Sequence, residues 1–175
     1  MVKAAQKNAD HFAPLYERYH HPVFVFIWRR VQDEALAADL AANVFLKAML
    51  NLKRYKFRNL PFSSWLFRIA VNETNMYFRK AKRQRSVAID PEDLQHVAQE
   101  SELDEQEANL GLMVEAMNEL PEDRAQLIEL RFFEKCSFKE LGSILGVEEA
   151  TAKMRVYRVL KRLKKMITLK GGSAQ

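Results

Sequence analysis

The charged side chains of this 175-residue chain fall into three consecutive blocks of alternating sign. Residues 1–85 carry 16 basic and 6 acidic side chains, residues 86–123 carry 12 acidic and no basic ones, and residues 124–175 carry 12 basic and 5 acidic ones. Surface charge for solubility alone is one interpretation, but random placement rarely excludes every Lys and Arg from 38 residues. The pattern favours two polyanion-binding modules joined by an acidic tether.

The composition excludes several classes of protein. Hydrophobic residues make up 48% of the chain, with only five Gly and five Pro, which is typical of a globular and helix-rich protein. The single cysteine, Cys136, excludes an internal disulfide framework and a multi-Cys zinc site. No continuous apolar run approaches the roughly 18 residues of a membrane helix, and residues 1–10 are too polar for a secretory signal. We therefore expect a cytoplasmic protein without membrane insertion, metal or cofactor.

Hydrophobic periodicity predicts an all-α fold of two small helical domains. In the first block, apolar residues recur at three- and four-residue steps from Phe12 to Ile27, interrupted by Pro22, so we expect one kinked helix or two. A second helix begins near Asp33, and a third begins near Ser63 as N-cap and runs into a basic tail at residues 79–85. The predicted domains are 1–86 and 109–170, with an acidic linker at 87–108 that has room for a short helix.

The second block contains a strong local signature. Ser137 and Glu140 form a capping box at the start of one short helix, and Gly146 marks its end. A longer helix begins near Glu149, with Ala152, Val156, Leu160, Leu163 and Ile167 on an inner stripe. This pair predicts a helix-turn-helix whose second helix enters the DNA major groove; an ordinary helical hairpin with a solvated basic face is the alternative. The predicted DNA contacts are Thr151, Lys153, Arg155, Arg158, Lys161 and Arg162.

Three segments of the chain resemble a known protein family. Residues 120–165, from LPEDRAQLIELRFF to RVLKRLKK, resemble the promoter −35-binding region of bacterial sigma factors. Residues 12–48 and 62–83, including AADLAANVFLKA and FRIAVNETNMYFRKAKR, resemble the core-polymerase-binding and −10-binding parts of the same family. The order of the blocks and the short linker resemble the small extracytoplasmic-function type.

The resemblance implies roles for particular residues. Asp39, Leu40 and Phe45, with Asn43 where the family commonly has Glu, match the helix that packs against the β′ clamp helices of RNA polymerase. Residues 68–72 match the helix that reads the single-stranded −10 element, and residues 53–62 match the loop that receives a flipped-out base. A buried structural role is the alternative for Asn72. The implied −10 contacts are Tyr55, Phe57, Arg68, Asn72, Asn75, Arg79, Lys80, Lys82 and Arg83.

The sequence therefore predicts a non-enzymatic sigma subunit that binds the β′ and β subunits of RNA polymerase and promoter DNA to initiate transcription. The resemblance also implies an anti-sigma partner, and a linker that threads the nucleic-acid channel of the polymerase. One alternative is a stand-alone helix-turn-helix regulator with a ligand- or partner-sensing first domain. A helical hydrolase using the carboxylates of residues 90–107 is another, but it lacks a positioned nucleophile, base or phosphate loop. Cys136 is expected to be a small core or boundary residue, with redox sensing as the alternative.

Overall fold

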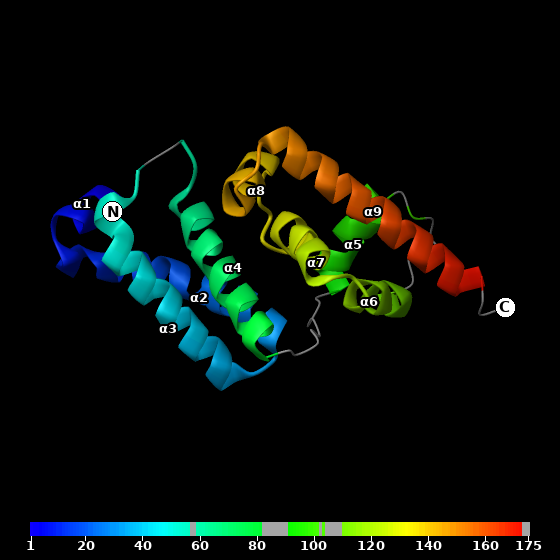
Figure 1. The fold of residues 1–175 in the computed structure, drawn as a ribbon, viewed down its shortest axis with the longest axis horizontal. Coiled ribbons are helices and arrows are strands. Elements are labelled where there is room, and N and C mark those ends of the chain that lie inside the picture. The colour runs from blue at the N-terminus through cyan, green and yellow to red at the C-terminus, as the bar shows by residue number, and fades with distance from the viewer. Residues whose placement is uncertain (57–58, 82–90, 102, 104–109, 173–175) are drawn as a thin grey trace. The chain divides into compact units, whose positions relative to one another are not determined.

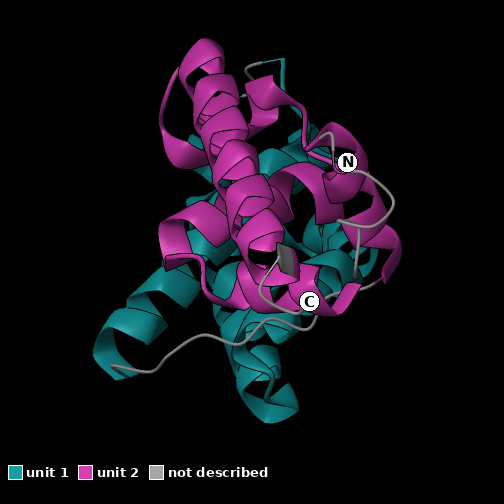
Figure 2. Ribbon diagram, turned by 90° about the vertical axis from the view of Figure 1, so that its right-hand side faces the viewer, with its two compact units in different colours: residues 1–86 teal, residues 87–175 magenta. Residues whose placement is uncertain are grey.

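The computed structural model describes residues 1–56, 59–81, 91–101, 103 and 110–172, and within these ranges the secondary structure is entirely helical (Figure 1). The chain divides into two compact units, residues 1–86 and 87–175 (Figure 2). The all-α prediction is confirmed. The domain limits 1–86, 87–108 and 109–170 stay a prediction about where functional modules begin and end.

The first unit is built on three long helices that contact one another pairwise, α2, α3 and α4. Phe26 and Ile27 of α2, Ala41 and Val44 of α3 and Leu66 of α4 are buried in the core between them. The elements of this unit are α1 (Val2–Lys7), the 3-10 helix η1 (Ala9–Phe12), α2 (Ala13–Val31), α3 (Glu34–Asn51), the 3-10 helix η2 (Leu52–Arg54) and α4 (Phe62–Ala81).

The helix ends of this unit follow the expected chemistry with one exception. Pro22 lies inside a single continuous α2, so the stretch is one helix and not two. The Asp33 carboxylate accepts a hydrogen bond from the Leu36 amide at 3.0 Å and caps α3. Ser63 is not the cap of α4, because the turn already forms at Pro61, whose carbonyl accepts from the Ser64 amide at 3.1 Å. The helix therefore begins at Phe62.

The segment Glu34–Arg54 is long and apolar enough to match a membrane span by length and composition, with a mean hydropathy of 1.4. The search for continuous apolar runs did not predict this, because Asp39, Asn43 and Lys47 interrupt the Leu- and Ala-rich sequence of α3. Five side chains on one side of the helix, Ala37, Ala41, Val44, Ala48 and Leu52, are buried in the unit. The segment thus has the placement of a core helix.

The second unit is organised around α9, which contacts α6, α7 and α8. Its inner stripe is as predicted, since Ala152, Val156, Leu160, Leu163 and Ile167 are all buried, together with Val159. The elements are α5 (Pro91–Glu100), α6 (Leu110–Asn118), α7 (Glu122–Ile128), the π-helix η3 (Glu129–Phe133), α8 (Phe138–Leu145) and α9 (Glu149–Gly172).

The predicted capping signals are present at α8. The Ser137 hydroxyl accepts from the Glu140 amide at 3.2 Å, and the Glu140 carboxylate accepts from the Ser137 amide at 2.8 Å. Gly146 ends the helix with φ of +70°, a left-handed conformation that costs glycine little. These two signals fix the start and the end of α8 and so the point at which the chain turns into α9.

Candidate nucleic-acid interface

The exposed face of α9 carries the predicted duplex contacts. Lys153, Arg155, Arg158, Lys161 and Arg162 are exposed, and Thr151 at the start of the helix is half-buried. Because the opposite side of α9 is packed against three other helices, these six side chains share the surface that the unit leaves open. The arrangement of α8, the Gly146 turn and α9 is that of a helix-turn-helix, whose second helix presents its outer face to the major groove.

An aromatic and cationic cluster extends this face onto α8 and η3. The rings of Phe138 and Tyr157 lie 6.2 Å apart, and the Lys153 ammonium lies 5.9 Å from the Phe138 centroid and 6.0 Å from the Tyr157 centroid. The Arg131 guanidinium lies 4.6 Å from the same Phe138 ring. Sequence reasoning missed Phe138, Tyr157 and Arg131, because only the fold brings residues from three elements together.

The first unit contains a cavity of about 460 Å³ that gathers several of the predicted single-strand contacts. Tyr55 and Trp65 form an aromatic wall with ring centroids 4.9 Å apart. Asn72 is exposed and faces the same cavity, which overturns the alternative of a buried structural Asn. The lining residues are Lys47, Asn51, Arg54, Tyr55, Trp65, Ile69, Asn72 and Glu73.

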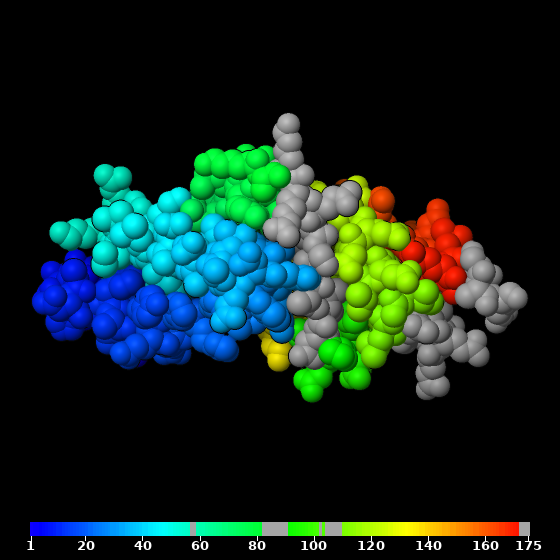
Figure 3. Space-filling view, turned by 90° about the horizontal axis from the view of Figure 1, so that it is seen from below, coloured from blue at the N-terminus to red at the C-terminus, as the bar shows by residue number. Residues whose placement is uncertain are grey.

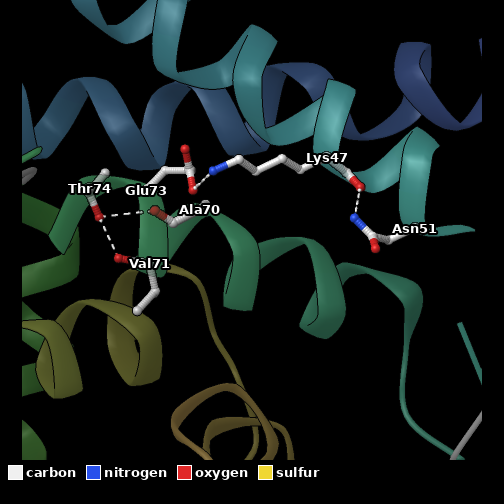
Figure 4. A network of polar contacts seen from close by, with 6 residues as sticks. All are labelled: Lys47, Asn51, Ala70, Val71, Glu73 and Thr74. Atoms are coloured by element: carbon white, nitrogen blue, oxygen red, sulfur yellow. Dashed lines mark hydrogen bonds and ion pairs between the residues drawn. The ribbon is translucent and has the colours of Figure 1, made fainter. Parts of the chain in front are cut away.

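A charged pair from two helices lines this cavity (Figure 4). The Lys47 ammonium on α3 lies 2.5 Å from a carboxylate oxygen of Glu73 on α4. The Glu73 side chain is only 8% exposed, whereas that of Lys47 is 46% exposed. The Asn51 amide donates to the Lys47 carbonyl at 2.8 Å, which holds the last turn of α3 at the edge of the pair. Neither charged residue was among the predicted contacts.

The other predicted single-strand contacts divide into three groups. Arg68, Arg79 and Lys80 are exposed on α4, where they can meet phosphates. Asn75 is half-buried, and its side-chain oxygen accepts from the Arg30 guanidinium at 3.2 Å, which gives it a partner inside the unit. Phe57, Lys82 and Arg83 lie outside the described residues.

The predicted polymerase contacts on α3 also divide by exposure. Asp39 and Asn43 are exposed, whereas Leu40 and Phe45 are buried. The Phe45 ring packs edge-on against Tyr16, with centroids 4.8 Å apart. Figure 3 views the side of the first unit on which α2 and α3 lie next to each other at the surface. Exposed apolar residues continue the open face of α3, with Leu46 50% and Leu50 70% exposed; sequence reasoning missed both.

Within the described ranges there is no group of three or more His, Cys, Asp or Glu residues that could hold a metal ion. Cys136 is buried, and burial together with the nearby Glu140 and Glu134 carboxylates raises the pKa of its thiol to about 12. A protonated, buried thiol is a poor nucleophile, which argues against the redox-sensing alternative. The groups brought together at both surfaces suit recognition of a polyanion.

Comparison with known proteins finds two matching family models. Residues 15–84 match sigma-70 region 2, and residues 110–163 match sigma-70 region 4. The first match covers most of α2 and all of α3 and α4, including every residue that lines the aromatic cavity, and the second covers α6 to α8 and most of α9. The chain thus has two basic surfaces within the matched segments: the α4 side chains Arg68, Arg79 and Lys80 in the first, and the exposed face of α9 in the second.

Individual proteins similar to the chain agree with the two sigma-70 matches. The chain is 27% identical over 172 residues to the ECF RNA polymerase sigma factor BldN of Streptomyces coelicolor, matching 95% of this chain and 64% of that protein's length. It is 26% identical over 156 residues to the ECF RNA polymerase sigma factor SigM of Bacillus subtilis, matching 86% of this chain and 91% of SigM. Among solved structures, CnrH in complex with the cytosolic domain of CnrY has a similar fold, with a TM-score of 0.65, 18% identity and coverage of 96% and 95%.

Proposed function

The chain belongs to the sigma-70 family as a sigma factor of the extracytoplasmic-function type, a promoter-specificity subunit of bacterial RNA polymerase, and from this membership we propose how its surfaces divide the work of initiation. The observation that carries the proposal is the position of the two basic surfaces. Each lies within one of the two matched regions, in the order that sigma regions 2 and 4 require. The chain itself performs no chemistry; it binds.

The open face of α3 docks on the polymerase core. Asp39 and Asn43 provide polar contacts to the β′ clamp helices, and the exposed Leu46 and Leu50 add apolar area next to them. Leu40 and Phe45 act from beneath, since their side chains are buried and hold α3 against the rest of the unit. An interface with an apolar centre and a polar rim has the usual make-up of a protein–protein contact.

The cavity of the first unit receives an unstacked base of the −10 element. Tyr55 and Trp65 offer ring faces for stacking, and Asn72 offers an amide to a base edge. The Glu73 carboxylate and Lys47 ammonium add an acceptor and a donor to the same cavity. The exposed Arg68, with the two basic residues in the last turn of α4, would follow the phosphate backbone. Capture of a base lowers the free energy of the opened strand, which drives opening without catalysis.

The outer face of α9 recognises the −35 duplex. Arg155 and Arg158 lie toward the start of the helix, where base edges are within reach in a helix-turn-helix complex. Arginine matches the O6 and N7 acceptors of guanine through its planar fork. Lys161 and Arg162 lie farther along and would meet phosphates. We further propose that the chain contacts the β subunit and an anti-sigma protein. The acidic linker would lie within the nucleic-acid channel of the polymerase, and the chain would act in the cytoplasm, where the polymerase works.

A stand-alone regulator with a ligand-sensing first domain is not favoured, because residues 15–84 match sigma-70 region 2. Such a regulator would bind its DNA sites without the polymerase. The proposal instead requires that initiation at specific start sites depends on both the chain and the core enzyme.

The direct test is co-elution with core polymerase, followed by run-off transcription on a genomic library. Asp39→Arg should weaken core binding at least about tenfold, a change of about 1.4 kcal/mol, because it reverses a charge within the proposed contact. Its matched control is Glu17→Arg, an equal charge change at an exposed site on α2. Equal core affinities for the two variants would show that α3 is not the docking helix. A chain that yields no start sites with core enzyme would refute the proposed function.

A further inference from the structure

Helix α5 is an amphipathic helix that packs on the second unit. Leu94, Val97, Ala98 and Ser101 recur at helical spacing and are buried, and α5 contacts η3 and α6. The chain around it is acidic, since residues 86–123 contain no Lys or Arg. Its buried apolar face shows that α5 is part of the packed structure of the unit that carries the recognition helix.

The last residue of α5 reaches the exposed face of α9. The Tyr157 hydroxyl donates a hydrogen bond to the Glu100 carboxylate, with an oxygen–oxygen distance of 2.7 Å. Tyr157 lies one turn from Lys153 and one turn from Lys161, so the carboxylate meets a ring that lies between two cations of the basic face. The contact joins residues 57 positions apart in the sequence.

Helix stability alone does not account for Glu100. Acidic residues stabilise the first turn of a helix and are disfavoured in the last, because the free carbonyl groups there carry negative partial charge. Glu92 and Asp93 occupy the favourable end of α5, whereas Glu100 occupies the unfavourable one. Glu100 therefore does not serve to stabilise α5, and its structural contact is the hydrogen bond from Tyr157.

We propose that α5 is an intramolecular clasp that competes with DNA for the recognition helix, with Glu100 occupying, through Tyr157, part of the surface that duplex phosphates would approach. This inference rests on the proposed function only in taking α9 as the DNA-binding helix. The carboxylate also lowers the positive potential around Lys153 and Lys161 within a Debye length of about 8–10 Å. Free protein is thereby held in a state of lower DNA affinity, and withdrawal of the Glu100 carboxylate from Tyr157 raises that affinity.

The hydrogen bond is exposed at both ends, which suits a clasp that opens readily. An exposed contact of this kind is weak, so separating Glu100 from Tyr157 needs little free energy, while the buried apolar face keeps α5 packed on the unit. The Tyr157 ring also has contacts that do not involve Glu100, since the Phe138 ring lies 6.2 Å away and the Lys153 ammonium lies 6.0 Å from its centroid. The ring therefore remains in place to meet DNA when Glu100 leaves.

The test compares Glu100→Gln with Asp123→Asn, a loss of one negative charge at an exposed position in the first turn of α7. Each full-length variant is titrated with a duplex selected from a random pool by the wild-type chain and with a scrambled duplex of the same length. Glu100→Gln should bind both duplexes about two- to fivefold more tightly at low salt, and the gain should shrink as salt rises. Asp123→Asn should match the wild type. Equal affinities for Glu100→Gln and Asp123→Asn would overturn the clasp.

Hydrogen exchange gives a second measurement that does not depend on affinity. Amides in the last turn of α5, including that of Ser101, which donates to the Val97 carbonyl at 2.9 Å, should exchange faster in wild-type protein when duplex is bound. Greater protection of this turn by duplex would overturn the clasp. Tighter binding by Glu100→Gln without preference for the selected duplex would support the clasp and refute −35 recognition. A chain that binds no duplex would refute both.

Discussion

Asn72 and Asn75 lie three residues apart on α4, and the family resemblance assigns both to −10 binding, but the structure gives them different surroundings. Asn75 accepts a hydrogen bond at 3.2 Å from the Arg30 guanidinium, and Arg30 is 1% exposed. Burial lowers the pKa of Arg30 to about 9, so the side chain is still cationic at neutral pH. A buried cation is costly without acceptors. Asn72, in contrast, faces the open cavity.

These surroundings predict opposite effects of two equal truncations. Asn75→Ala should destabilise the first unit by about 1.5–3 kcal/mol, because a hydrogen bond from a charged, buried donor is lost. For a unit of this size each kcal/mol lowers the unfolding temperature by about 4–8 °C. Asn72→Ala removes an exposed side chain and should change stability by less than about 0.5 kcal/mol. It should nevertheless slow open-complex formation, because the cavity loses its exposed amide.

Unfolding of the first unit can be followed in the full-length chain. Both tryptophans, Trp28 and Trp65, lie in this unit, so intrinsic fluorescence in urea reports its free energy of unfolding alone. Open-complex formation is measured with core polymerase on a promoter carrying 2-aminopurine in the −10 element. Both variants should keep wild-type affinity for the −35 duplex. If Asn72→Ala loses as much stability as Asn75→Ala, or if Asn72→Ala opens the promoter normally, the assignment of the two amides is wrong.

Two further predictions concern the second unit. Arg155→Ala should cost about 1–3 kcal/mol in binding and relax the preference at one base pair of the −35 element, whereas Lys161→Ala should weaken all duplexes alike and lower the salt slope by about one unit. Binding of duplex variants over a salt series separates them, and a change in salt slope alone for Arg155→Ala would assign it to phosphate. Since the pKa of Cys136 is raised to about 12, its contribution to stability is present below pH 9 and is lost as the pH rises from about 9 to 12. Native protein should therefore resist iodoacetamide at pH 8 and react on unfolding; rapid native alkylation would show that the thiol is accessible.

The parts of the fold that the sequence predicted best are those set by contacts within a few residues. The capping box of Ser137 and Glu140 and the left-handed Gly146 involve neighbours in the chain, and each has the predicted geometry. The inner stripe of α9 follows from helical periodicity. The start of α4 lies two residues before the predicted one, because the Pro61 carbonyl forms the first turn and this competes with the capping preference of Ser63.

The exposure of individual site residues was harder to predict. Leu40 and Phe45 match the family motif, but a motif records which residues occur together and does not distinguish a side chain that contacts a partner from one that supports it. In this unit both are buried, whereas Leu46 and Leu50 on the same helix are exposed. Helical periodicity alone could have raised Leu46 and Leu50 as candidates, because they lie seven and eleven residues after Asp39, on the same face as that carboxylate.

Contacts between side chains far apart in the sequence were not predicted. Lys47 and Glu73 are 26 residues apart on different helices, and their pairing requires α3 and α4 to pack in one register. Shifting either helix by one residue would turn a side chain by about 100° and separate the charges. The pair therefore indicates the register in which α3 and α4 pack, in addition to making the cavity polar. A buried carboxylate paired with a half-exposed ammonium joins α3 to α4 at the cavity, so the proposed stacking of a base on Tyr55 and Trp65 would need no rearrangement of these two helices.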